Sequence, residues 1–538
     1  MKSDTYDYVV IGSGSAGAVV ASRLSESGRY TVLCLEAGEK NENYLWSRPP
    51  AGTALMIDNP AVNWRYYSEP NESHGNRPIY VPRGKMLGGT SSINGMIYNR
   101  GQQRDFDTWA KLGCKGWSYA EILPYLKKVE SSALGSDQYR GRTGPVKVTE
   151  ASKVSPFYDL FIKSAIAVGI PYNPDYSGAT QEGVAMAQQT IYQGLRQSSA
   201  TQYLAPARGR PNLTILTGAE AASLILNARR CDGVRFRRAG EMQEARATRE
   251  VIVSCGTVNS PKLLELSGIG NPDILQQRGI QVVHALKGVG ENLREHYAAA
   301  IKWRFNRPGI SIARIGQGWR LALEVLRYLI FRKGFIAQGL GTMRIYARSS
   351  PELEHPDVMM SIAPFILEPR KDGTGRRMSP IEGFFTFTHM QHAESTGTIH
   401  IKSADPFAPP VINFRFLDTA ADRKTAIAAV RCARKIVAAP PLAETIAEEI
   451  VPGHHIQTDE EILDYIRNTG GTTSHLVGTC KMGNDAMAVV DERLRVHGIT
   501  GLRVADASIM PTMIAATNIP CMTIGEKCAD MVLADAAG

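Results

Sequence analysis

The first 38 residues constrain the fold more than any other stretch. A short apolar run at residues 8–11 leads into Gly12-Ser13-Gly14-Ser15-Ala16-Gly17; a helical pattern follows, and a second apolar run ends in Glu36. This order predicts a strand, a tight turn, a helix and a second strand with an acid at its end, which is typical of a Rossmann-type α/β unit.

The three glycines of this turn have separate physical roles. Gly12 lets the chain turn sharply out of the strand, Gly14 leaves room for a pyrophosphate, and Gly17 lets the helix pack closely on the sheet. The helix N-terminus offers N–H groups to a diphosphate, and Glu36 is placed to accept hydrogen bonds from a ribose hydroxyl. The context favours a dinucleotide site over a simple tight turn, and does not decide between NAD and FAD.

Length and charge narrow the class of protein. A chain of 538 residues is too long for one compact core, so two or more domains are expected. The 61 basic residues are interleaved with 52 acidic ones, without the basic stripe that nucleic acid would need. The eight cysteines are scattered singly, which predicts no metal site and a reducing compartment. The first strand begins too early for a signal peptide, so we expect a cytoplasmic location.

Residues 319–333 are a local exception to this mixed character. Arginines and a lysine (Arg320, Arg327, Arg332 and Lys333) accompany a dense set of large apolar side chains. Such a segment could lie on a membrane surface, which would place the protein at the inner membrane. The alternative is an amphipathic helix packed on its own domain.

Two further stretches of small residues are predicted to approach the same ligand. Residues 83–95, followed by 99–101 and 105–107, are rich in glycines and hydroxyls that let a backbone run flush against a ligand. The short apolar run at 250–254 leads through a small-residue turn into a helical pattern at 256–270, which predicts a second helix start near the cofactor.

The segment 298–453 has a different character. Strand-like runs occur at 358–363, 383–389 and 398–401, with a helical pattern at 419–437. We expect a second domain here, built on an antiparallel sheet and supplying substrate contacts. Dense motifs return around His475, at 501–511 and at 516–520, before a final helix.

In combination these blocks resemble the glucose-methanol-choline (GMC) oxidoreductases, which are FAD-dependent alcohol-oxidising flavoproteins. The likeness is nearest to bacterial choline-dehydrogenase-like and L-sorbose-dehydrogenase-like members, and it covers essentially the full length. Five blocks carry it in the family's order: the first turn with Glu36-Ala37-Gly38, residues 84–107, residues 256–270, Gly288-Val289-Gly290-Glu291-Asn292-Leu293, and the His475 and Asn518 blocks. The resemblance implies FAD rather than NAD.

The resemblance also implies a domain plan. A Rossmann-type α/β FAD-binding domain would comprise 1–155, 205–297 and 465–538, and an α+β substrate-binding domain with an antiparallel sheet and helices would comprise 156–204 and 298–464. The cofactor-binding positions implied are Gly12, Gly14, Ser15, Ala16, Gly17, Glu36, Ala37, Gly88, Gly89, Ser92, Asn94, Gly95, Ala221, Asp506, Ala507, Asn518 and Ile519.

In this family the flavin faces a His and a second His or an Asn, and His475 and Asn518 match those positions. Alcohol oxidation removes a hydroxyl proton and a hydride, so a base within reach of the hydroxyl is needed while flavin N5 receives the hydride. We expect His475 to be that base and the Asn518 amide to hold the hydroxyl. His296 and His389 are further candidates for the substrate pocket.

Three positions bear on departures from the family pattern. The family usually has Pro after the catalytic His and an aromatic before it, whereas this chain has Leu476 and Ser474, which puts the orientation of the base in doubt. Members that attach FAD covalently do so through a His at the position of Ile93, so FAD is expected to be non-covalent here.

The expected function is therefore oxidation of an alcohol to an aldehyde or ketone, with electrons passed to a quinone-like acceptor, a dye or O₂. An FAD-containing hydroxynitrile lyase-type enzyme on the same scaffold and a non-catalytic flavin-binding module remain as alternatives. The sequence does not identify the alcohol: choline would call for an acidic or aromatic cage, and a sugar for several polar contacts.

Overall fold

A computed structural model describes residues 3–339, 341–369 and 376–537. The predicted opening unit is present: β1 (Ser3–Ile11), the glycine-rich turn, α1 (Gly17–Leu24) and β2 (Val32–Glu36) follow one another. All five positions of β2 are buried, as expected for a strand covered on both faces.

These strands belong to a seven-stranded sheet, which we call the cofactor sheet. Its order is β11-β2-β1-β14-β13-β12, and β27 pairs with the end of β14. The four strands β11, β2, β1 and β14 run parallel, whereas β13 and β12 add an antiparallel edge. Their bounds are β11 (Leu213–Thr217), β12 (Glu220–Asn227), β13 (Arg230–Arg238), β14 (Glu241–Val253) and β27 (Leu502–Val504).

Parallel strands bring their carboxyl ends to one edge of the sheet, where ligands bind in such folds. The end of β1 leads into Gly12, the end of β2 carries Glu36, and β14 leads into α7 (Gly256–Leu266). The two predicted strand-to-helix junctions are therefore confirmed and lie at the same edge.

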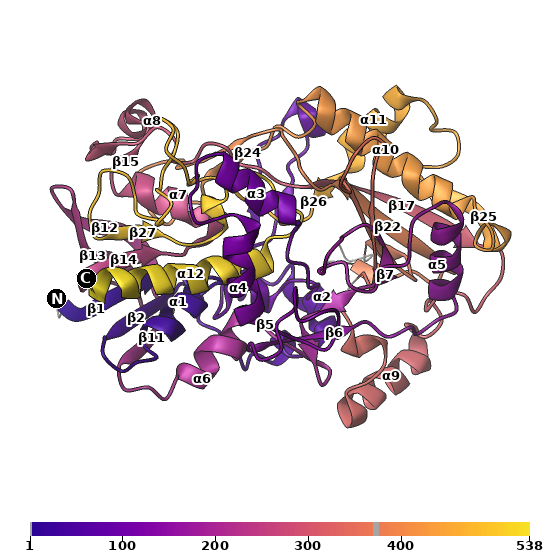
Figure 1. Ribbon diagram of the computed structural model, residues 1–538, viewed down its shortest axis with the longest axis horizontal. Coiled ribbons are helices and arrows are strands. Elements are labelled where there is room, and N and C mark those ends of the chain that lie inside the picture. The colour runs from indigo at the N-terminus through magenta and orange to yellow at the C-terminus, as the bar shows by residue number, and fades with distance from the viewer. Residues whose placement is uncertain (1–2, 340, 370–375, 538) are drawn as a thin grey trace.

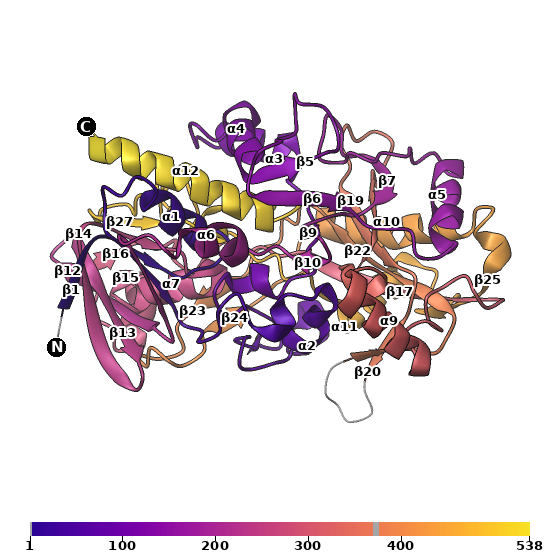
Figure 2. The same ribbon diagram turned by 90° about the horizontal axis from the view of Figure 1, so that it is seen from below.

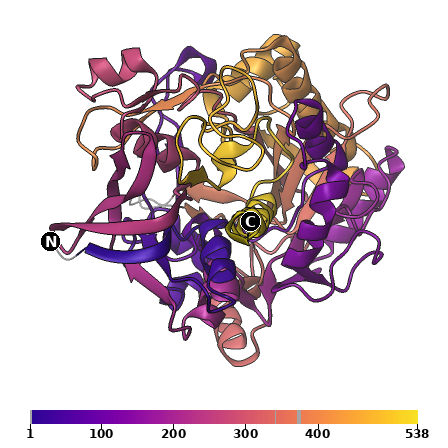
Figure 3. The same cartoon turned by 60° about the vertical axis from the view of Figure 1, so that its left-hand side comes forward.

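Helices cover the cofactor sheet. The closing helix α12 (Asn518–Ala537) packs on α1 and on α4 (Tyr119–Val129), and Figure 3 looks nearly along α12 with the C-terminus toward the viewer. The start of α4 is fixed by a capping box, in which the Glu121 carboxylate accepts from the backbone N–H of Ser118 at 3.0 Å. Figure 1 shows this half of the molecule with both chain ends.

The other half contains the predicted antiparallel sheet, which we call the second sheet (Figure 1). Its order is β25-β17-β22-β19-β18-β7, with β26 paired to the start of β17. On one face it packs against α5 (Phe157–Ala167) and α10 (Ala420–Val437). Its strands are β7 (Gly183–Met186), β17 (Tyr297–Phe305), β18 (Met343–Ala347), β19 (Val358–Ala363), β22 (Gly383–Met390), β25 (Ile446–Val451) and β26 (Gly471–Thr472).

The expected strands at 358–363 and 383–389 are thus confirmed, as is the helix at 419–437. The run at 398–401 is also a strand, β23 (Thr398–His400), but it pairs with β24 (Val411–Asn413) in a separate two-stranded sheet. The proposed domain division stays a prediction, and two of its boundaries cut elements, one inside β17 and one inside α11 (Asp459–Thr469).

Among the described residues no helix is both long enough and apolar enough to cross a membrane.

The rest of the described chain contains further, mostly shorter elements. These elements are α2 (Thr53–Met56), α3 (Gln103–Lys111), α6 (Ala205–Ala207), α8 (Pro272–Gln277), α9 (Gly318–Phe331), η1 (Leu45–Ser47), η2 (Pro50–Gly52), η6 (Phe335–Ala337), β3 (Tyr66–Tyr67), β4 (Tyr80–Val81), β5 (Glu130–Ser132), β6 (Val146–Glu150), β8 (Gln188–Gln189), β9 (Ile191–Tyr192), β10 (Leu195–Arg196), β15 (Ile269–Gly270), β16 (His284–Ala285), β20 (Leu367–Pro369), β21 (Arg376–Met378), β23 (Thr398–His400) and β24 (Val411–Asn413).

Candidate active site

A cavity of about 550 Å³ is lined by residues from both sheets. The carboxyl edge of the cofactor sheet contributes Gly12 and Glu36, and the second sheet contributes residues of β18, β19 and β22. The cavity therefore joins the predicted dinucleotide site to the domain that was expected to supply substrate contacts.

The turn after β1 has the geometry that a dinucleotide needs. Gly12 has a φ of +95°, which favours glycine, and a Cβ on Gly17 would lie 1.9 Å from the carbonyl oxygen of Gly12. A Cβ on Gly14 would meet nothing within 4 Å, and Gly14 lines the cavity. The backbone here is open to a ligand, so the residues present fit an FAD diphosphate.

Glu36 lines the cavity from the end of β2, as predicted. Its carboxylate accepts from the Ser13 hydroxyl at 2.6 Å and from the Gly38 backbone N–H at 2.9 Å. Burial raises the pKa of Glu36, and these hydrogen bonds oppose that effect. They hold the carboxylate in place at the position expected for a ribose contact.

Most of the cofactor-binding positions implied by the resemblance line this cavity, and four do not: Gly17, Gly88, Ser92 and Ile519. Gly88 has a φ of +88° and the Ser92 hydroxyl donates to the Leu87 carbonyl at 2.7 Å, which fixes the second glycine-rich turn. Asp506, which does line the cavity, accepts from the Gly256 backbone N–H at 2.9 Å and so anchors the start of α7.

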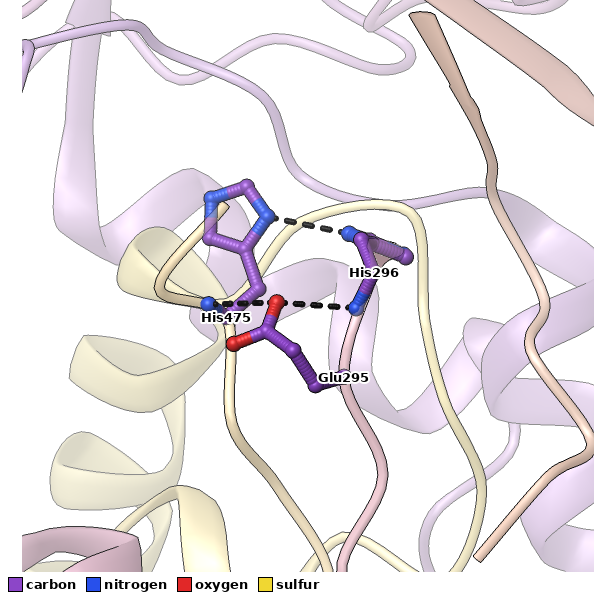
Figure 4. A group of neighbouring side chains, drawn as sticks. All are labelled: Glu295, His296 and His475. Atoms are coloured by element: carbon purple, nitrogen blue, oxygen red, sulfur yellow. Dashed lines mark hydrogen bonds between the residues drawn. The ribbon is translucent and has the colours of Figure 1, made fainter. Parts of the chain in front are cut away.

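The predicted base, His475, also lines the cavity. Its Nδ1 lies 3.0 Å from Nδ1 of His296 and 2.9 Å from the hydroxyl oxygen of Thr473. Figure 4 shows this nitrogen turned toward His296, with the other ring nitrogen on the opposite side of the ring. His475 is thus held through Nδ1, which leaves Nε2 for a ligand.

The partners of His296 determine which nitrogen of each ring is protonated. His296 Nε2 lies 2.8 Å from the backbone carbonyl of Gln391, which can only accept, so neutral His296 carries its proton there. Its Nδ1 is then an acceptor and needs a donor. His475 must supply that donor from Nδ1, which leaves its Nε2 unprotonated.

Thr473 leads to the same assignment by a separate route. Its hydroxyl donates to Glu295 Oε1 at 3.0 Å, so its oxygen is free to accept from His475 Nδ1. Two acceptors therefore face the same ring nitrogen of His475.

Glu295 organises the loop that carries the base. Its Oε1 also accepts from the backbone N–H groups of His296 at 2.8 Å and His475 at 3.0 Å, and its Oε2 accepts from the Thr472 hydroxyl at 2.7 Å. Glu295, His296 and His475 lie close enough together to resemble a metal-binding group (Figure 4), yet these hydrogen bonds account for the cluster. The expectation of no metal site stays a prediction.

The two departures from the family pattern flank the base, and side chains hold the backbone there. Ser474 has a φ of 66°, and its carbonyl accepts from the Arg83 guanidinium. The carbonyl of Leu476 accepts from the Thr257 hydroxyl at 2.7 Å, and the leucine side chain is buried. This loop is therefore fixed without a proline.

His296 and His389 are buried, His475 is half-buried, and all three are neutral. Burial, assisted by His389 and by the charges of Arg83 and Arg344, lowers the pKa of His475 to about 3. Burial lowers the pKa of His389 to about 4 and holds that of His296 well below the usual 6.5. His475 is thus an unprotonated base at neutral pH.

The other histidine and asparagine candidates fall in different places. His389 stacks on His296 with ring centroids 4.2 Å apart, and neither ring lines the cavity. Asn518 lines the cavity at the start of α12, where its amide oxygen accepts from the Ser15 hydroxyl at 2.8 Å. That contact supports the cofactor-binding role of Asn518, and its catalytic role stays a prediction.

Sequence reasoning missed the residues of the second sheet that face the cavity. Arg344 and Tyr346 line the cavity from alternate positions of β18, and Ser361 lies opposite Arg344 on β19. The available signal was an arginine inside a short apolar strand pattern. Thr473 and Glu295 were missed as well, because their partners are distant in sequence.

Comparison with known proteins gives consistent matches along the chain. Two family models for GMC oxidoreductase match, the N-terminal one over residues 6–298 and the C-terminal one over residues 393–525. The oxygen-dependent choline dehydrogenases of Brucella suis and Sinorhizobium fredii are each 38% identical, with 98% of this chain and 95% of the relative covered.

Solved structures give the same picture. A formate oxidase superposes with a TM-score of 0.91 at 27% identity, covering 100% of this chain and 99% of that chain. A pyridoxine 4-oxidase from Mesorbium loti superposes with a TM-score of 0.87 at 27% identity, covering 98% and 99%.

Proposed function

The chain belongs to the GMC oxidoreductase family, whose members are FAD-dependent alcohol oxidoreductases, and from this premise we propose that it oxidises an alcohol to an aldehyde or ketone with His475 as the base. The observation that carries the proposal is the hydrogen-bond geometry of the histidine pair, which fixes the proton positions. His475 donates through Nδ1 to His296 and exposes an unprotonated Nε2 to the cavity.

FAD, when bound, supplies the hydride acceptor at its N5 atom. The protein supplies the proton acceptor: the substrate hydroxyl donates to His475 Nε2, which takes the proton as the carbonyl forms. The resulting imidazolium keeps its Nδ1–H bonds to His296 and Thr473. Glu295, which accepts from the backbone of His475, adds a negative charge nearby. The hydrogen bonds that orient the base are therefore in place before the reaction begins.

The electron acceptor is O₂ or a quinone-like molecule. The relatives are named as oxygen-dependent choline dehydrogenases, and solved neighbours are named as oxidases. Those names support O₂ as the acceptor and also make choline a candidate substrate. FAD is held without a covalent bond, because position 93 is an isoleucine that has no group to form one.

An anaerobic alcohol panel tests the proposal. We expect at least one alcohol to bleach the flavin absorbance, and reoxidation with O₂ or a quinone analogue then identifies the acceptor. Failure of every alcohol, together with cleavage of a cyanohydrin without flavin reduction, would instead establish the lyase-type alternative. Flavin binding with neither reaction would leave the non-catalytic module.

A further inference from the structure

A buried guanidinium that has no carboxylate partner in the described part of the chain lies in the cavity wall. Arg344 on β18 is 6% exposed and lines the cavity beside Tyr346. Its Nη1 has a weak contact at 3.9 Å to the sulfur of Met359, and its Nε is buried with no hydrogen-bond partner among the described residues. A buried charge of this kind is costly unless something pairs with it.

The side chains around Arg344 are neutral. Ser361 faces it across the strand pair, and Tyr346 accepts a hydrogen bond from the Asn99 amide at 2.8 Å. Burial is the largest influence on the pKa of Arg344 and lowers it, whereas Tyr346 and Tyr176 raise it. No carboxylate among the described residues contributes to the shift. The described residues therefore leave the guanidinium without a counter-ion.

Arg344 also lies within electrostatic reach of the base. Its charge is one of the influences that lower the pKa of His475, and both side chains line the same cavity. A substrate whose hydroxyl meets His475 can therefore extend toward Arg344.

We propose that Arg344 binds a carboxylate of the substrate, so that the alcohol oxidised by this protein is a hydroxy acid. The planar guanidinium fork matches a carboxylate with two parallel hydrogen bonds, which would satisfy its unpaired donors. The same charge repels a quaternary ammonium, so choline is a poor substrate here in spite of the relatives' name. The kinetic test of this inference rests on the proposed function, because it measures oxidation of an alcohol.

Matched pairs of alcohols provide that test. 4-(Hydroxymethyl)benzoate and 4-hydroxybutyrate are compared with their amides and with choline, by anaerobic flavin reduction. We expect kcat/KM to favour each carboxylate over its amide by about tenfold or more, because hydrogen bonds to charged groups are the strong ones. Equal use of carboxylate and amide by the wild type would overturn the proposal, as would a preference for choline or for a phosphate monoester of the same chain length.

Two variants separate binding from structure. Arg344→Met should abolish the carboxylate preference, and Arg344→Lys should retain part of it through its charge. Because Met replaces an unpaired buried charge, the Met variant should keep its FAD and its Tm. A lower Tm, or a preserved carboxylate preference in Arg344→Met, would show instead that Arg344 is structural.

A dead-end ligand keeps this inference separate from the proposed function. 4-Methylbenzoate has no hydroxyl, so its perturbation of the flavin absorbance reports binding alone. We expect it to bind the wild type at least about tenfold more tightly than 4-methylbenzamide does, and Arg344→Met to lose this difference. This readout stands even if no alcohol reduces the flavin.

A second inference comes from an independent observation on α9. Figure 2 shows α9 at the surface of the second-sheet half, close to α2. Nearly every described side chain of this helix is exposed, including Trp319 at 68%, Leu329 at 62% and Phe331 at 64%. The alternative that its apolar side packs on its own domain is therefore wrong.

The orientation of α9 is the reverse of an ordinary amphipathic helix. Its less exposed positions are Glu324 and Tyr328, one turn apart, and the Tyr328 hydroxyl donates to the Gly194 carbonyl at 3.0 Å. Helical spacing puts the opposite face at Trp319, Leu323, Leu326 and Ile330, all of them exposed and apolar. The protein thus presents an apolar face outward.

Basic side chains lie on the Glu324 side of the helix and directly after its end. Arg320, Arg327, Arg332 and Lys333 are exposed, and the one acid of the helix, Glu324, is 3.3 Å from Arg327. We infer that α9 docks in the surface of an anionic lipid bilayer, with its apolar face among the acyl chains and its basic side chains at the headgroups. Neighbouring α2 exposes Leu55 and lines the cavity with Thr53 and Ala54, so the docked face lies beside the cavity wall.

Flotation with vesicles tests this second inference. The holoenzyme should float with vesicles containing phosphatidylglycerol, and Leu323→Glu/Leu326→Glu should reduce the bound fraction about tenfold or more. The matched control, Leu112→Glu/Ile166→Glu, alters exposed apolar residues elsewhere and should float normally. Flavin content and light scattering report folding and oligomeric state. Equal flotation of all variants, absence of flotation, or a dimer that only the α9 variant dissociates would overturn the inference.

Discussion

The Nδ1 atoms of His296 and His475 lie 3.0 Å apart, and one proton joins them. Because the Gln391 carbonyl takes the other N–H of His296, that shared proton belongs to His475. His296 thereby acts as a positioning residue: it keeps the base in the tautomer with a free Nε2.

Variants of His296 test this positioning role. His296→Asn places an amide oxygen near the former Nδ1 and can still accept from His475, whereas His296→Leu cannot. We expect flavin reduction in the Leu variant to be slower than in the Asn variant by a factor of about ten or more, because a wrongly oriented base loses much of its effect. Rapid-mixing kinetics under anaerobic conditions measures this. Equal rates in the two variants would show that the hydrogen bond has no role in orienting the base.

Replacing Glu295 should loosen the loop of the base. Glu295→Gln substitutes an amide for a buried carboxylate that accepts from two backbone N–H groups and two hydroxyls. The expected cost is about 1 to 3 kcal/mol of unfolding free energy, because charged acceptors with several donors are lost. Urea unfolding measures this cost, with the exposed Glu394→Gln as the control. A stability loss no larger than the control's would contradict the account.

The depressed pKa of His475 predicts an unusual pH profile. Since that pKa is about 3, the base stays unprotonated at neutral and mildly acidic pH. We therefore expect the rate of flavin reduction to show no loss of activity near the ordinary histidine value of about 6.5. A titration of kcat/KM across that range with a neutral alcohol would reveal any loss of activity on acidification. A loss near pH 6.5 that depends on His475 would be incompatible with a base of strongly lowered pKa.

The same shifts give a stability prediction with a definite sign. His389 and His475 bind protons less tightly in the folded protein than in the unfolded chain. Their contribution to folding stability is therefore complete above about pH 6.5 and falls as the pH drops toward their folded pKa values of about 4 and 3. His389→Leu should therefore flatten the fall of Tm with acidification. An unchanged slope would argue against a buried, neutral His389.

FAD release tests the non-covalent assignment. Ile93 lines the cavity and is 1% exposed, and a hydrocarbon side chain cannot form a bond to the flavin. We expect trichloroacetic acid to precipitate a colourless chain and leave the flavin in the supernatant. Flavin fluorescence that remains with the washed pellet would contradict this assignment.

Local patterns predicted much of this molecule. The strand, glycine turn and helix that end at Glu36 were predictable because each element depends on neighbours within a few residues. His475 was identified by its resemblance to a family motif. The fold class followed from the same blocks, which recur in the family's order along the chain.

Other features depend on contacts between distant segments. Glu295 and His475 are separated by 180 positions, and the pairing of β17 with β26 brings them together. Arg344 is one arginine in a short strand, and its unpaired state emerges only when the second sheet forms around it. For α9, the same apolar period suits a buried face and an outward face, so tertiary packing alone decides between them.

The most direct test of the central claim is the rate of anaerobic flavin reduction in His475→Ala, measured by stopped flow with the best alcohol of the panel. His454→Ala, at an exposed histidine, is the matched control. Loss of the base should slow reduction by about 10² to 10⁴ while FAD content and Tm stay near wild type, and the control should react normally. Reduction by His475→Ala at the wild-type rate would contradict the assignment of His475 as the base.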